Sequence, residues 1–380
     1  MRLSRNVIIL SVCLMLLKGA TASAEVDFNI YPNGEILGPA VSFTDINETE
    51  SDIKKHPEDL LEKNDNIIPY GFALANTIGY PNGKAIIPRF EAGFATGVAA
   101  YQYDRYENFT KDNPEVPGVG ANAAVHFGLG ITEDTDVTFK LFVNQGMYTP
   151  DKSIDKESDE RDYKISLKET DLISIGVKGR YNLIGETSIV PFILSFGGVT
   201  AGVAVDYSHG NISASTTYTD RRPVSFTATS SFSGDEFEQE IDIETRVKGE
   251  TQIEWNIVSV TPEIMAYADL LYIFTFYTGP AVALNAGSAN IHASAEGSLK
   301  NQEEVYADES HITTLAETGS TIATGELKAN APYDIPFAVP MWKLGMEINI
   351  MAFKIQAEAA TVLTSPADSF TAQVGLRMQF

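Results

Sequence analysis

The chain has 380 residues, of which 51 are Asp or Glu and 27 are Lys or Arg, so its formal net charge is -24. This acidity argues against nucleic acid as a partner, because the phosphate backbone is itself polyanionic. The chain has one cysteine, Cys13, which excludes a disulfide-stapled scaffold.

Residues 1–24 have the features of a secretory signal peptide. Two arginines precede an apolar run over 7–17, and Ala22-Ser23-Ala24 fits the small-residue pattern of a cleavage site. The run is too short to span a membrane as a helix. We therefore expect export, with 25–380 as one domain; lipid modification of Cys13 is the alternative.

Residues 25–66 allow two interpretations. Weak alternation at Val41 and Phe43 favours a first strand within 26–45, followed by an acidic outer loop over 46–66. The alternative is an amino-terminal plug or periplasmic extension.

Large apolar residues at even positions predict a strand over 67–79. A turn over 80–84 follows, because it contains the Asn-Gly pair typical of tight turns.

Two-residue periodicity recurs along the rest of the chain. Successive side chains of a strand point to opposite faces, so alternation builds a wall with one apolar and one polar side. A slip of the apolar phase at Ile257-Val258 indicates a β-bulge. The predicted strands are 84–103, 119–131, 137–143, 163–183, 188–207, 243–262, 265–293, 342–350 and 353–359.

The richest later apolar run, over 264–286, does not fit a membrane-spanning helix, which argues against a helical membrane protein. Asp269 and Gly279-Pro280 interrupt it, and its β-branched and aromatic residues favour strand. No other mature segment is long and apolar enough to span as a helix.

The last eleven residues alternate most regularly. Phe370, Val374, Leu376 and Phe380 fall on an apolar side, with polar or small residues between them. The length matches the roughly 9–11 residues that a tilted strand needs to cross a bilayer. This stretch resembles the closing strand of bacterial outer-membrane β-barrels, which implies that the insertion machinery reads Phe380 as an assembly signal.

The connections between the predicted strands fall into two classes. If the last strand ends in the periplasm, the inner connections are 80–84, 132–135, 184–187, 262–266 and one near 351. The outer connections are then 104–118, 144–162, 208–242, 294–335 and 364–369. The inner set is short and the outer set mostly long, as in barrels with short periplasmic turns and long extracellular loops. We therefore predict an all-β, antiparallel transmembrane β-barrel of about twelve strands, with fourteen as the alternative.

The polar phase of the predicted strands supplies the candidate pore-lining residues. These charges set solute selectivity in an open pore, or they neutralise one another and rigidify a filled lumen. The inward residues are Arg89, Glu91, His126, Lys140, Lys178, Arg180, Lys343, Glu347, Lys354, Glu358 and Arg377.

Catalytic and metal sites are not indicated. None of the five histidines has the spacing of a metal site, and the sequence lacks the GxSxG, P-loop and HExxH motifs. We expect no enzyme activity and no cofactor.

Three short motifs carry a further resemblance. Residues 87–94 (IPRFEAGF), 173–181 (ISIGVKGRY) and 190–194 (VPFIL) resemble stretches of barrels related to the long-chain fatty-acid transporters. The Asn-Pro-Ala signature of that family's hatch is absent, so no substrate-contacting residue is carried over.

Together these features predict passive passage of small or hydrophobic solutes across the outer membrane. The expected partners are outer-membrane lipid, the insertion machinery and an unidentified solute. The alternative is a structural or adhesive surface barrel whose acidic loops bind partners.

Overall fold

The computed structural model describes residues 25–32, 67–82, 90–102, 118–144, 156–158, 161–229, 236–302, 305–306, 314–316 and 318–380. It is almost entirely antiparallel sheet, with one helix, α4 (Ile67–Asn76). The strands are β1 (Glu25–Pro32), β2 (Phe90–Tyr101), β3 (Gly118–Thr132), β4 (Thr135–Asn144), β5 (Lys156–Ser158), β6 (Arg161–Ile184), β7 (Thr187–Val190), β8 (Leu194–Thr229), β9 (Glu236–Leu270), β10 (Phe274–Asn301), β11 (Val305–Tyr306), β12 (Thr314–Ala316), β13 (Thr321–Asp334), β14 (Ala338–Ile350), β15 (Phe353–Val362) and β16 (Phe370–Gln379).

The main sheet closes on itself. Its neighbours run β2-β3-β4-β6-β8-β9-β10-β14-β15-β16 and return to β2, always antiparallel. The sheet has 14 strands in all, and the antiparallel barrel predicted from the sequence is confirmed. β16 closes the ring by pairing with β15 and β2, as its alternation predicted.

Apolar side chains cover the outside of this wall. On β16, Val374 and Leu376 are exposed while Gln373 and Arg377 between them are buried. The same division of exposed apolar and buried polar residues recurs on β3, β4, β6 and β14. A closed wall satisfies every ladder hydrogen bond internally, and the apolar outer side suits lipid.

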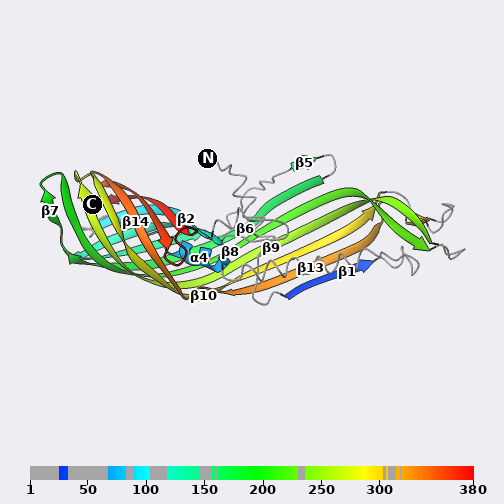
Figure 1. The fold of residues 1–380 in the computed structure, drawn as a ribbon, viewed down its shortest axis with the longest axis horizontal. Helices are drawn as coiled ribbons and strands as arrows, with labels where there is room; N and C mark the ends of the chain where they lie inside the picture. The colour runs from blue at the N-terminus through cyan, green and yellow to red at the C-terminus, as the bar shows by residue number, and fades with distance from the viewer. Residues whose placement is uncertain are drawn as a thin grey trace.

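Part of the sheet continues beyond the ring. β6, β8, β9 and β10 run on from the ring into a curved sheet that projects from one end of the barrel, and β13 pairs with β10 in this sheet (Figure 1). The segments 208–242 and 294–335, predicted as outer loops, therefore consist largely of strand, and this part of the prediction is wrong.

β1 lies at the edge of this projecting sheet, where it pairs with β13 over its whole length. A strand upstream of residue 67 is thus present, although it lies outside the ring. The residues Val41 and Phe43 and the predicted loop 46–66 lie outside the described residues.

The short connections gather at the other end. The turn over 132–135 is where the sequence predicts it. The turn predicted over 262–266 is wrong, because β9 runs unbroken to Leu270 and turns at 271–273. No register shift is present at Ile257-Val258, so the predicted β-bulge is also wrong.

The strand predicted over 67–79 is wrong as well, because 67–76 forms α4. Alternate large residues in this segment suggested the two-residue period of a strand. The segment is instead a helix enclosed by the wall, where α4 contacts β2, β3, β8, β9 and β10. Leu74 and Ala75 are both buried, which alternation does not allow. A helix surrounded by protein is apolar all round and shows no clear periodicity. Within the described residues, no helix combines the length and apolar character needed to cross a membrane.

Candidate functional site: the plugged barrel interior

The predicted inward residues do point inward. Ten of the eleven are buried, with at most 7% exposure, and the eleventh, Arg89, lies outside the described residues. They come from seven strands of the ring. Eight of them take part in three groups of ion pairs.

The first group lies near the end with the short turns. Arg377 lies between two carboxylates, donating to Glu91 at 2.7 Å and to Glu347. Lys354 is 3.5 Å from Glu347. Gln379 donates to Glu91 at 3.1 Å. The guanidinium and its partners are almost free of solvent, and such a buried charge is tolerated only with partners in good geometry.

The second group adds acids that the sequence did not single out. Arg180 makes a two-point contact with Asp136, at 3.0 and 2.6 Å. Lys178 and Lys343 both pair with Glu263, Lys343 at 3.0 Å. Asp136 and Glu263 share the polar phase of their strands, which was the signal that could have found them.

The third group joins the wall to the segment 67–82. Lys140 pairs with Asp206 at 2.9 Å. The same ammonium donates to the carbonyls of Asn76 and Ile78, at 2.8 and 3.0 Å. These carbonyls lie at the carboxyl end of α4, where orphan acceptors and the helix dipole favour a cation.

Residues 77–82 continue from α4 through the interior. The Tyr80 hydroxyl donates to Asp206 at 2.7 Å, and its ring lies 4.7 Å from the Lys140 ammonium. Asn82 donates to Glu358 at 2.6 Å and accepts from Lys178. Tyr80 and Asn82 of the turn predicted over 80–84 are therefore buried in the lumen, whereas Gly83 and Lys84 lie outside the described residues.

Beyond the ion pairs, around α4, the lumen is apolar. Phe72 of α4 stacks on Trp255, with ring centroids 4.8 Å apart, and Tyr70 stacks on Tyr101 at 4.1 Å. The wall residues Ile257, Ile291, Val339, Met341 and Val362 complete this buried cluster. This cluster explains why the apolar phase slips at Ile257-Val258 without a β-bulge. Ile257 points inward toward the apolar cluster, while Val258 points outward.

Two glycines allow the segment to fit. A Cβ on Gly176 would collide with Asp206 and the Tyr80 hydroxyl, and a Cβ on Gly120 would collide with the backbone of α4 at Gly71. We call residues 67–82 the plug, because they occupy the barrel interior and contact several sides of the wall.

His126 is the exception among the predicted residues. It is buried, but neither ring nitrogen has a hydrogen-bond partner among the residues that the structure describes. Within the same ranges, no group of three or more His, Cys, Asp or Glu is placed to hold a metal ion.

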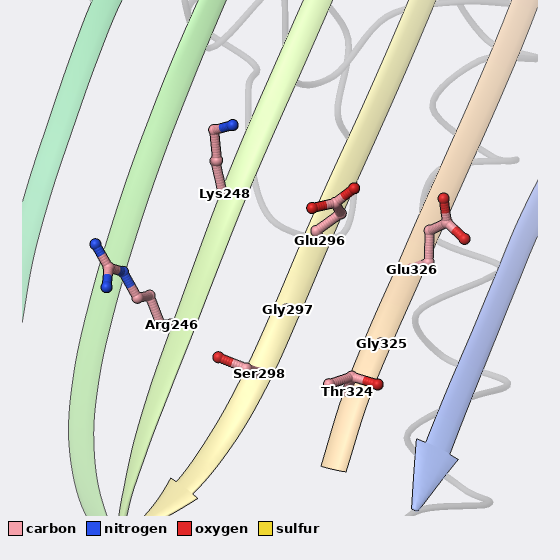
Figure 2. A pocket seen from close by; sticks show the side chains of 8 residues that line it. All are labelled: Arg246, Lys248, Glu296, Gly297, Ser298, Thr324, Gly325 and Glu326. Carbon is pink, nitrogen blue, oxygen red and sulfur yellow. The ribbon is translucent and has the colours of Figure 1, made fainter. Parts of the chain in front are cut away.

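A hollow lies on the projecting sheet, away from the plug. It has a volume of about 440 Å³, and Figure 2 shows Arg246 and Lys248 on one side and Glu296 and Glu326 on the other. Glu296 and Glu326 lie directly opposite each other on β10 and β13. Lys328 pairs with Glu326 at 2.5 Å. Gly297, Ser298, Thr324 and Gly325 complete the lining.

A closed antiparallel wall, apolar outside and lined with buried ion pairs, defines a transmembrane β-barrel of the outer-membrane kind. Here the barrel also holds a plug from its own amino-terminal region. The chain belongs to the Lsa36-like family, whose profile matches residues 43–380.

Other comparisons give distant likenesses. A search of curated proteins finds no match. The translocator domain of the autotransporter NalP from Neisseria meningitidis is 10% identical, with 79% of this chain and 90% of that chain covered and a TM-score of 0.26. The P. putida toluene transporter TodX is 8% identical, with 81% and 92% covered and a TM-score of 0.22. Likenesses at these TM-scores carry no argument about this chain.

Proposed function

We propose that this chain is an outer-membrane barrel through which small or hydrophobic solutes pass when the plug shifts within the lumen. The observation that carries the proposal is that a separate segment occupies the lumen. A wall that needed only rigidity could be filled by its own side chains.

The wall charges support displacement of the plug. Lys140 and Asp206 pair with each other, as do Lys178 and Lys343 with Glu263, without any plug atom between them. These ions therefore keep partners when the plug moves, which avoids the large cost of an unpaired buried charge. The vacated lumen keeps a polar, wettable level.

The apolar level supports the solute class. Trp255, Ile257, Ile291 and Met341 surround α4 and would line the space that it leaves. Such a lining favours solutes with an apolar body, because binding them removes apolar surface from water.

Planar-bilayer recordings test this proposal. The double variant Tyr80→Phe with Asn82→Ala removes the plug's bonds to Asp206 and Glu358 while the ion pairs of the wall remain. We expect it to open more often than the unchanged protein. Tyr207→Phe is the matched control, because its hydroxyl bonds Asn256 on the exposed outer side. Equal, silent behaviour of all three folded barrels would contradict solute passage.

A second candidate is a surface anchor, and the projecting sheet favours it. This sheet carries the mixed-charge hollow of Arg246, Lys248, Glu296 and Glu326 away from the barrel. The filled barrel would then hold the sheet for a partner with charges of both signs. Silent bilayers, with partner binding lost on Arg246→Ala, would favour this function.

Export through a cleaved signal peptide belongs to the same proposal. β1 begins at Glu25, directly after the predicted cleavage site. Amino-terminal sequencing of the protein from the outer-membrane fraction is expected to start at Glu25, and a retained leader would contradict cleavage there.

A further inference from the structure

Three turns at the short-connection end of the barrel are apolar. They are Val190-Pro191-Phe192-Ile193, Leu270-Leu271-Tyr272-Ile273 and Ile350-Met351-Ala352-Phe353, and none contains a charge. Their tips are strongly exposed: Met351 at 98%, Phe192 at 80% and Tyr272 at 57%.

These turns form one continuous rim, held by backbone hydrogen bonds between neighbours. Leu271 donates to Ile193 at 2.8 Å, and Asn349, beside the third turn, donates to Ile273 at 2.7 Å. β7 and the carboxyl terminus lie at this end, on the left in Figure 1. We call the three turns the apolar rim.

Four of the apolar residues in these turns have positive φ, which is unusual for large side chains. Phe192, Leu271, Tyr272 and Met351 have φ between 54° and 64°. Gly, Asn and Asp adopt this left-handed region most readily, and two-residue hairpin turns normally use them. Large apolar side chains thus occupy positions where polar or small residues would fit better in water.

The opposite side of the same end is polar. The turn between β3 and β4 contains Glu133 and Asp134, both exposed. The short-connection end therefore has an apolar side and an acidic side.

We propose that the apolar rim is embedded in membrane lipid, so that this side of the barrel sits deeper in the bilayer than the β3–β4 side. The apolar rim continues the lipid-facing belt without a polar break, through Leu270 and Phe353, which are themselves outward and exposed. Burial in acyl chains removes the water-exposed apolar surface of all three turns together. The occupant is lipid rather than a protein, because docking surfaces combine apolar centres with Arg and a polar rim.

Site-specific fluorescence tests this inference. In a Cys13→Ser background, Phe192→Cys and Met351→Cys are each labelled with an environment-sensitive dye. Glu133→Cys is the control at a turn tip on the acidic side. The full chain is inserted into phosphatidylcholine vesicles that contain a fraction of doxyl-labelled lipid, and insertion is checked by heat-modifiable migration.

We expect doxyl lipid to quench the dye at 192 and 351, and aqueous iodide to quench it at 133. Iodide quenching at 192 and 351 as strong as at 133 would overturn the proposal, since the apolar rim would then be wet. Lipid contact at only one of the two positions would also overturn it. The test needs no conductance, so its outcome is independent of solute passage.

Discussion

At the scale of single residues, the interior is stabilised by charged side chains that each bind more than one partner. Lys140 neutralises Asp206 and also caps the carboxyl end of α4. Arg377 joins Glu91 and Glu347 from two different strands. Because Lys140 and Asp206 are both buried, removing Lys140 leaves Asp206 without water or its counterion.

Replacing Lys140 by Met tests this dependence. We expect the free energy of unfolding to fall by about 3–5 kcal/mol, because Asp206 loses its counterion and the carbonyls of α4 lose their donor. Urea unfolding followed by tryptophan fluorescence measures the change. Lys328→Met is the control, since its pair with Glu326 is solvent-exposed and worth about 0–1 kcal/mol. Equal effects of the two variants would contradict the role of Lys140.

Gly176→Ala tests the fit of the plug. The added Cβ collides with Asp206 and the Tyr80 hydroxyl. We expect a loss of about 1–3 kcal/mol, as overpacking of a buried site costs. Gly179→Ala, three residues along β6, has nothing within 4 Å of its new Cβ and should unfold like the unchanged protein. A tolerated Ala at position 176 would show that the plug is not held tightly there.

At the scale of elements, the sequence predicted strands well wherever the wall separates lipid from a polar lumen. β3, β4, β14 and β16 follow the predicted alternation, because one face is apolar and the other is not. Prediction failed where the lumen itself is apolar. There Trp255 and Ile257 of β9 point inward against the apolar cluster while Val258 points outward, so the apolar residues change face along the strand and the period is hidden.

The plug was misread for a related reason. Its helix is largely buried against five strands, so neither a period of 3.6 nor a period of 2 identifies it. The ten described residues of the candidate site are buried, but their partners Asp136, Asp206 and Glu263 were missed. Which charges pair depends on registers between strands, and these registers are fixed by contacts distant in sequence.

The closing strand supports a prediction at this scale. Phe380 donates its backbone N–H to Phe90 at 2.9 Å, and the two rings lie 5.6 Å apart. We expect Phe380→Ala to lower the yield of heat-modifiable barrel in membranes. Phe337→Ala, at an exposed position outside the closing strand, is the control. Unchanged assembly of the Phe380 variant would count against a role in insertion.

At the scale of the whole molecule, the chain divides into a lipid-facing ring, a plug within it and a sheet that projects beyond it (Figure 1). The ring supplies the membrane surface, and in the proposed function the plug determines whether the lumen is continuous. The projecting sheet carries polar chemistry away from the membrane. Solute passage depends on the plug being able to move, whereas anchoring depends on its staying in place.

The most direct measurement is the conductance of the barrel in planar bilayers after the plug has been cross-linked to the wall. The side chains of Asn76 and Ser259 are hydrogen bonded at 2.7 Å, so cysteines at both positions can be bridged by dibromobimane in a Cys13→Ser background. Ser259→Cys alone, treated with the same reagent, is the control. We predict that openings seen in planar bilayers before treatment disappear in the bridged protein and persist in the control. Openings that continue unchanged through a bridged barrel would contradict the account.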